Sequence, residues 1–139
     1  MECEVKWLND GMSLIAETGS GHLLNMDGSK EIGGQDLAPR PMELMLAGAG
    51  GCTTFDVVTI LKRGRHAIEA CHVKLAATRA ATDPKVFTHI QFHYLVSGKN
   101  LDPSAVERAI KLSSEKYCSA SIMLGKTAKI EHTWEIINV

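Results

Sequence analysis

The sequence predicts an α+β fold, because short strands, a long apolar helix, a strand hairpin, a second helix and a final strand follow one another along 139 residues. The strongest signal is the stretch 41–63, which carries no charge between Leu44 and Phe55. The second signal is the alternation of apolar and polar residues in three later stretches, 68–79, 86–97 and 129–138. We therefore expect a single domain, 1–139, built around the apolar helix.

The N-terminal elements read as an antiparallel meander. Three short strands, 2–8, 12–17 and 22–26, are separated by the turn sequences Asn9-Asp10-Gly11 and Gly19-Ser20-Gly21. The following segment, 27–40, is rich in turn residues and leads directly into the helix. It is a candidate wall of a functional site or a candidate dimer contact.

The helix is expected to run from Pro41 to Arg63, with proline in its first turn and cations in its last. A helix that is apolar on all sides should be buried on all sides. Its small residues, Ala47, Gly48, Gly51 and Cys52, form a stripe that would allow another backbone to approach closely.

The C-terminal half predicts a hairpin with one wet face, a helix and a closing strand. Asp83-Pro84 makes the hairpin turn, and Asp102-Pro103 opens the second helix as N-cap and first residue. Hydroxyl residues around Cys118 weaken helical continuity, so this cysteine should lie at a helix junction.

Composition and charge exclude several classes of function. With 15 basic and 16 acidic residues and a net charge of -1, the chain has no basic surface for nucleic acid or anionic membranes. The start of the chain is charged from Glu2 and lacks an apolar signal core, so secretion is not expected. The apolar run is too short and too rich in glycine to be a convincing membrane span, which needs about 20 apolar residues. We expect a soluble cytoplasmic protein whose cysteines rest as thiols.

Most catalytic motifs are missing from the sequence. His89 and His93 share a strand face but would lie about 13 Å apart, too far to bind one metal ion. Zinc motifs, phosphate loops and serine nucleophile motifs are absent, so no metal and no cofactor are expected. Thiol chemistry remains, with Cys52 and Cys118 as the pair. A thiolate can attack a peroxide, and a second thiol can condense with the sulfenic acid that results.

The two cysteine motifs resemble those of a known family. The pattern is Pro41-x-Glu43-Leu44-x-x-Ala47-x-Ala49-x-Gly51-Cys52, followed by Tyr117-Cys118-x-x-Ser121. It resembles the OsmC and Ohr family of organic hydroperoxide reductases and is most similar to the YhfA-like branch. The resemblance implies an intertwined homodimer, with antiparallel sheets around two long central helices. It also implies that Cys52 is the peroxidatic cysteine, that Cys118 is the resolving cysteine, and that a dithiol such as a lipoyl group supplies electrons.

The sequence departs from the family pattern in the charges around the thiol. Met42 stands where active members carry a glutamate, and no arginine precedes Arg40. Arg40 and Glu43 are therefore the candidate charge partners of Cys52. Asp56, one turn after Cys52, would oppose thiolate formation if it is ionised and close.

We predict a thiol-dependent organic hydroperoxide reductase with Cys52, Cys118, Arg40 and Glu43 as its catalytic residues. The alternative is a non-peroxidatic dimer that binds a small apolar ligand or senses redox state, in a cavity lined by Met42, Met45, Phe55 and Met123. A structural homodimer with inert thiols is the third reading. The sequence does not specify the substrate, the reductant, the sulfur–sulfur distance or any role for Cys3 and Cys71.

Overall fold

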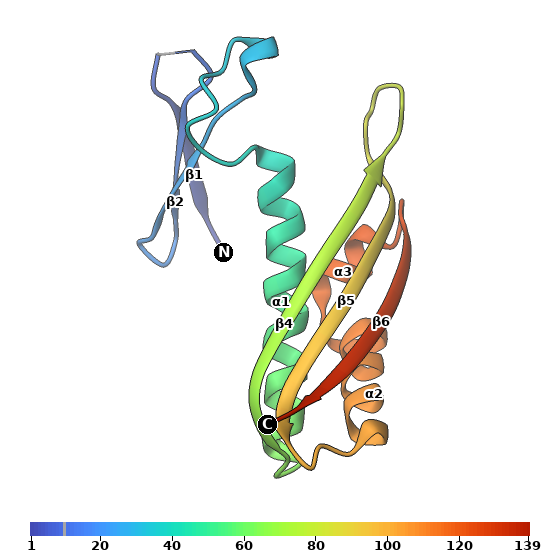
Figure 1. Cartoon of the computed structure of the whole chain (residues 1–139). Coiled ribbons are helices and arrows are strands. Elements are labelled where there is room, and N and C mark those ends of the chain that lie inside the picture. Colours follow the sequence, from blue (N-terminus) through green and yellow to red (C-terminus); the bar gives the residue numbers. More distant parts are fainter. Residues whose placement is uncertain (10) are drawn as a thin grey trace. The chain divides into compact units, whose positions relative to one another are not determined.

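The structure is a computed structural model that describes residues 1–9 and 11–139 (Figure 1). It contains two three-stranded sheets and a set of helices, which confirms the α+β class. The chain forms two compact units, Met1–Leu46 and Ala47–Val139. That residues 1–139 act as a single domain stays a prediction.

The first unit contains the expected meander. Strands β1 (Cys3–Trp7), β2 (Leu14–Thr18) and β3 (Leu23–Met26) pair antiparallel in chain order. Cys3 is exposed on the edge strand β1. The predicted turn at Asn9-Asp10-Gly11 includes Asp10, which lies outside the described residues.

One buried carboxylate organises the segment after β3, which includes the short helix η1 (Lys30–Ile32). Asp27 accepts backbone N–H bonds from Gly28, Gln35 and Leu37 at 2.7, 3.1 and 3.2 Å. These bonds, led by the one from Leu37, lower the pKa of Asp27, so the carboxylate stays charged although it is 2% exposed. Through these hydrogen bonds, Asp27 holds together the two ends of the segment from Asp27 to Leu37.

Helix α1 spans Pro41–Arg63, which confirms the predicted bounds. Its buried residues lie along one stripe: Ala49, Gly50, Thr53, Val57 and Leu61. Phe55 is 73% exposed, so the expectation of burial on every side is wrong for the single chain. The stripe has i, i+4 spacing because one face of the helix packs against the sheet of the second unit.

The glycines of α1 have different surroundings. A Cβ added at Gly50 would lie 2.8 Å from Leu75 Cδ1 on β4, so this glycine permits the close approach of helix and sheet. A Cβ at Gly48 or Gly51 would meet none of the described atoms within 4 Å. The two glycines of the predicted small-residue stripe therefore face open space within the chain, whereas its Cys52 is partly buried.

By length and composition alone, α1 is long and apolar enough to cross a membrane, with 23 residues and mean hydropathy 1.6 over its best window. The core helix of a globular protein meets the same criteria, so the absence of a membrane span stays a prediction. The buried face of α1 contacts hydroxyl groups of Tyr94 and Ser113 through Thr53, so this face packs against protein.

The second sheet has the order β4-β5-β6, formed by β4 (Ala67–Arg79), β5 (Phe87–Lys99) and β6 (Lys129–Asn138). Strands β4 and β5 form the predicted antiparallel hairpin, whereas β6 pairs parallel to β5. The expectation of purely antiparallel sheets is corrected here. A helical crossover carries the chain from the end of β5 back to the end where β5 began, and parallel strands require such a connection.

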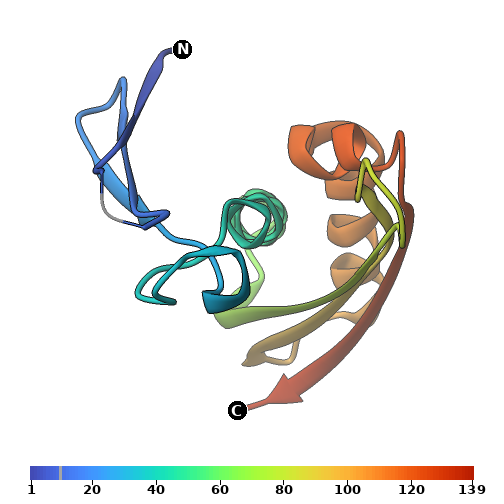
Figure 2. The ribbon, with the colours of Figure 1, turned by 90° about the horizontal axis from the view of Figure 1, so that it is seen from above.

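The crossover consists of α2 (Pro103–Leu112), the π-helical turn η2 (Ser113–Tyr117) and α3 (Ser119–Leu124). Asp102 caps α2 by accepting the Ser104 N–H at 2.9 Å, which confirms the predicted start. Cys118 is the N-cap of α3 and lies at the predicted junction. In this unit, α2 and the second half of α1 lie on one face of the curved sheet (Figures 1 and 2). Four side chains of the central strand β5 are buried between the sheet and these helices: Ile90, Phe92, Tyr94 and Val96.

Candidate dithiol site

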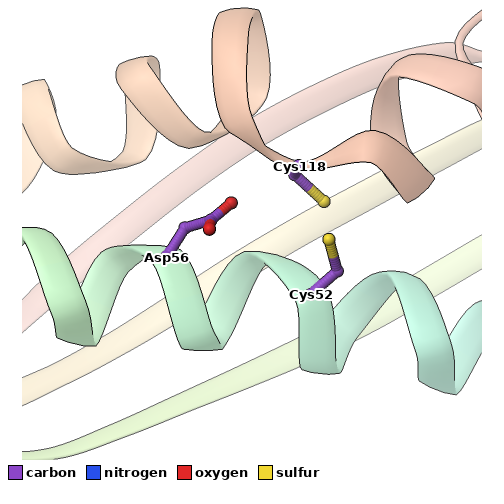
Figure 3. Close-up of side chains that lie close together, drawn as sticks. All are labelled: Cys52, Asp56 and Cys118. Carbon is purple, nitrogen blue, oxygen red and sulfur yellow. The ribbon is translucent and has the colours of Figure 1, made fainter.

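The structure brings Cys52 and Cys118 together. Their sulfur atoms and a carboxylate oxygen of Asp56 all lie within 4.8 Å of one another. Cys52 and Asp56 are one turn apart on α1, so both project from the same side of the helix. Figure 3 shows the two thiols pointing toward each other, with Cys118 reaching across from the junction between η2 and α3.

The two thiols have different surroundings. Cys118 is 0% exposed, and its sulfur accepts the Ser121 N–H at 3.4 Å. Burial, with a further contribution from the neighbouring Cys52 thiol, raises the pKa of Cys118, so it stays protonated at neutral pH. Cys52 is only partly buried. A molecule arriving from solvent therefore reaches Cys52 first, with Cys118 behind it.

A chain of buried hydroxyl groups leads away from Asp56. Ser113 Oγ donates to Asp56 Oδ2 at 3.0 Å and lies 2.9 Å from Thr53 Oγ1. Thr53 Oγ1 lies 2.8 Å from Tyr94 Oη, which is 3.1 Å from His132 Nδ1. The network thus joins α1, η2, β5 and β6.

The donor and the acceptor of every hydrogen bond in this network follow from the bond that Ser113 donates to Asp56. Ser113 uses its single hydroxyl proton on Asp56. Ser113 must then accept from Thr53, Thr53 from Tyr94, and Tyr94 from the Nδ1–H of His132. The network therefore selects the His132 tautomer that carries its proton on Nδ1.

Burial shifts the pKa values of the two aromatic side chains in this network, Tyr94 and His132. It raises the pKa of Tyr94, which keeps its hydroxyl proton available to Thr53. It lowers the pKa of His132, so this side chain stays neutral; its ring is tilted against that of Phe92, with the centroids 5.1 Å apart.

Arg40 and Glu43 belong to the first unit, where they pair with each other. Arg40 Nη1 lies 3.2 Å from Glu43 Oε1, and its Nη2 lies 3.2 Å from Asp36 Oδ1. Glu43 also accepts the Arg40 backbone N–H at 2.9 Å, and this bond, aided by the guanidinium charge, lowers the pKa of Glu43. That Arg40 and Glu43 act as charge partners of the Cys52 thiol stays a prediction.

The other cysteines lie elsewhere. Cys71 is half-buried on β4, where burial raises its pKa. Of the side chains expected to line an apolar cavity, Met45, Phe55 and Met123 are 51%, 73% and 72% exposed.

Sequence reasoning found the thiols but missed the network behind Asp56. Thr53, Ser113, Tyr94 and His132 come from four distant elements, and only the inward position of Tyr94 was visible in the strand alternation. Cys52, Asp56 and Cys118 were not predicted as metal ligands, because Cys118 is distant in the sequence from the other two and no close cysteine or histidine motif marks them. These three are the side chains in this site that can hold a metal ion.

Comparison with known proteins places these features in context. The family model described as OsmC-like protein matches residues 33–133. Protein YhfA of Escherichia coli (strain K12) is 44% identical over 137 residues, which cover 99% of this chain and 98% of that protein.

Two solved structures extend this comparison. One, described as structural genomics, is 43% identical, covers 100% of both chains and has a TM-score of 0.90. An organic hydroperoxide resistance protein OsmC from Legionella pneumophila is 17% identical, with 96% and 95% of the two chains covered and a TM-score of 0.71. At that identity the likeness shows the fold alone.

We expect Thr53→Val to lower the free energy of unfolding by about 1–3 kcal/mol, because the buried hydroxyls of Ser113 and Tyr94 each lose one of their two hydrogen bonds. Urea unfolding followed by circular dichroism measures the change. Thr54→Val is the matched control, because Thr54 bonds to Gly50 O within its own helix, and it should cost about 0.5 kcal/mol. Equal losses in the two variants would contradict the role given to Thr53.

The lowered pKa of His132 predicts a loss of stability in acid. The unfolded chain takes up a proton at His132 near pH 6.5, whereas the folded chain resists it, so this contribution is full above about pH 6.5 and is lost below it. We expect unfolding free energies measured between about pH 7 and pH 5.5 to fall less steeply in His132→Asn, which keeps an N–H donor but does not titrate. His72→Asn, at an exposed position on β4, should retain the original slope. Identical slopes for all three proteins would refute the prediction.

Proposed function

Because this chain belongs to the OsmC-like protein family, we propose that it is a thiol-dependent organic hydroperoxide reductase, in which Cys52 attacks the peroxide and Cys118 resolves the product. One observation carries the proposal. A partly exposed sulfur, Cys52, lies within 4.8 Å of a fully buried one, Cys118. This arrangement suits a division between a thiol that meets substrate and a thiol that waits behind it.

In the first step the Cys52 thiolate attacks the peroxide. A sulfur–oxygen bond forms, the oxygen–oxygen bond breaks, and the alkoxide leaves as an alcohol after it takes up a proton. Cys52 is oxidised to a sulfenic acid. Because Cys52 is partly exposed and Cys118 is buried, peroxide chemistry at this pair starts at Cys52.

In the second step Cys118 attacks the Cys52 sulfenic acid. A disulfide bond forms and the hydroxyl group leaves as water. The sulfurs have to approach to about 2 Å. The irregular backbone around Cys118, between the π-helical turn and α3, supports such a movement. A dithiol reductant, such as a lipoyl group, then returns both cysteines to thiols by exchange.

Activation of Cys52 requires a charge partner, because a thiol must lose its proton before it attacks. We retain Arg40 and Glu43 in this role, since Arg40 is the first arginine of the chain and Met42 cannot provide a charge. The arginine and glutamate already form an ion pair, which fixes the guanidinium. The proposed enzyme uses no cofactor and works in the cytoplasm.

We also propose a homodimer. The face of α1 that carries Gly48, Gly51 and Phe55 is exposed in the single chain, and a second long helix would cover it. The two small residues would let the partner helix approach closely.

The second candidate function is a non-peroxidatic dimer that binds a small apolar ligand or senses redox state. Two observations favour it: burial raises the pKa of Cys118, and Phe55 and Met123 expose large apolar side chains. The peroxide experiment below separates the two functions.

Reduced protein, treated with one equivalent of cumene hydroperoxide in the presence of a metal chelator, should lose two hydrogens per chain within seconds. Intact-mass measurement and peptide mapping should assign the new disulfide to Cys52 and Cys118. Cys118→Ser should instead stop at an oxidised Cys52, because the second thiol is missing. A control, Cys71→Ser, should behave as the unaltered chain. If all four thiols remain free after minutes, the reductase function fails and the binding function stands.

Phe55→Glu should convert the dimer to a monomer in light scattering coupled to size-exclusion chromatography, because a buried unpaired charge is costly. Phe55→Leu keeps an apolar side chain at the same position and should remain dimeric. A dimer that tolerates glutamate at this position would place the interface elsewhere.

A further inference from the structure

Cys52, Asp56 and Cys118 form a compact cluster of two sulfurs and one carboxylate, whose ligand atoms lie within 4.8 Å of one another (Figure 3). From this cluster we infer that the reduced protein has a zinc-binding site. The site goes beyond the proposed reductase function and does not depend on it, because it requires only the reduced thiols.

The distances suit a tetrahedral ion. Zinc bonds of about 2.3 Å to sulfur and about 2.0–2.2 Å to oxygen place neighbouring ligand atoms about 3.5–3.8 Å apart. The distances between the ligand atoms, which are 4.8 Å or less, therefore have to shorten by about 1.3 Å at most. Cys52 and Asp56 are fixed one turn apart on α1, while Cys118 lies on the irregular junction that can follow the ion.

The Asp56 carboxylate is available to a cation. Within the described residues, 1–9 and 11–139, no lysine, arginine or histidine forms an ion pair with Asp56. When zinc binds, two S–H bonds break, two Zn–S bonds and one Zn–O bond form, and two protons pass to solvent. The two released protons balance the two charges of the ion, so the net charge of this half-buried site does not change.

The surroundings of Asp56 prepare its carboxylate for a metal. Ser113 donates to Oδ2 at 3.0 Å and leaves Oδ1 available to a further partner. Behind Ser113, hydrogen bonds through Thr53 and Tyr94 hold the Ser113 hydroxyl in position. Metal-bound carboxylates in proteins are usually held by such hydrogen bonds.

The donor set favours zinc over other ions. Two thiolates exclude calcium and magnesium, which prefer oxygen, and a carboxylate as third ligand suits Zn²⁺ better than Cu⁺. Cys52 and Asp56 are both partly exposed, so the fourth position opens toward solvent and can hold water. The zinc-bound and disulfide states use the same sulfurs and exclude each other.

The test uses full-length Cys3→Ser/Cys71→Ser, which removes the two thiols outside the site. The reduced protein is titrated with Zn²⁺ against a chromogenic chelator and, separately, with Co²⁺. We expect one ion per chain. Bound Co²⁺ should show a thiolate charge-transfer band in the near ultraviolet and the intense visible bands of a tetrahedral ion.

Two substitutions and one chemical modification identify the ligands. In the same background, Asp56→Asn and Cys118→Ser should each weaken Zn²⁺ binding about 10-fold or more, whereas Asp83→Asn, at an exposed turn, should not. Alkylation of Cys52 with iodoacetamide should abolish binding without any substitution, so a folding defect in a variant does not decide the result. Circular dichroism verifies the fold of each variant.

Absence of Zn²⁺ binding, or unchanged affinity in Asp56→Asn, would overturn the site. The peroxide experiment is carried out with chelator present, so the two proposals fail separately. A disulfide without zinc binding removes only the zinc site, and zinc binding without peroxide oxidation removes only the reductase.

Discussion

The hydroxyl group of Thr53 is the point on which the second unit depends. It is 1% exposed and bonds to Tyr94 on the central strand and to Ser113 on the crossover, so one side chain of α1 connects the helix to both. Buried hydroxyl groups are costly when unpaired, and each partner here has few alternatives. The hydrogen bonds therefore fix the register of helix, strand and crossover, and the positions of Cys52, Asp56 and Cys118 follow from that register.

Local patterns predicted much of this fold. The bounds of α1 followed from a continuous apolar run between proline and two cations, and the buried face of β5 followed from strict alternation. The cap at Asp102 and the junction at Cys118 were also local signals. Each of these depends on neighbours within a few residues, which is the range over which a single sequence is informative.

The features of the fold that were not predicted depend on contacts between residues that are distant in the sequence. The parallel pairing of β6 was not predicted, because alternation sets the faces of a strand but not its direction. Burial of α1 was predicted from composition alone, and the exposed Phe55 shows that composition does not say which sides of the helix are covered within the chain. In the site, the approach of the two thiols was inferred from chemistry, whereas the bond from Ser113 to Asp56 joins residues far apart in the chain and had no local signal.

The order of the site residues along the chain has a consequence for synthesis on the ribosome. Cys52 emerges early, but its carboxylate neighbour is held by Ser113 on the crossover, and the hydroxyl chain behind Ser113 reaches His132 on β6. Parallel pairing of β5 and β6 joins segments that are distant in sequence, so it has to wait for the synthesis of the crossover and of β6. Nascent chains that do not yet contain β6 therefore carry Cys52 without its assembled surroundings.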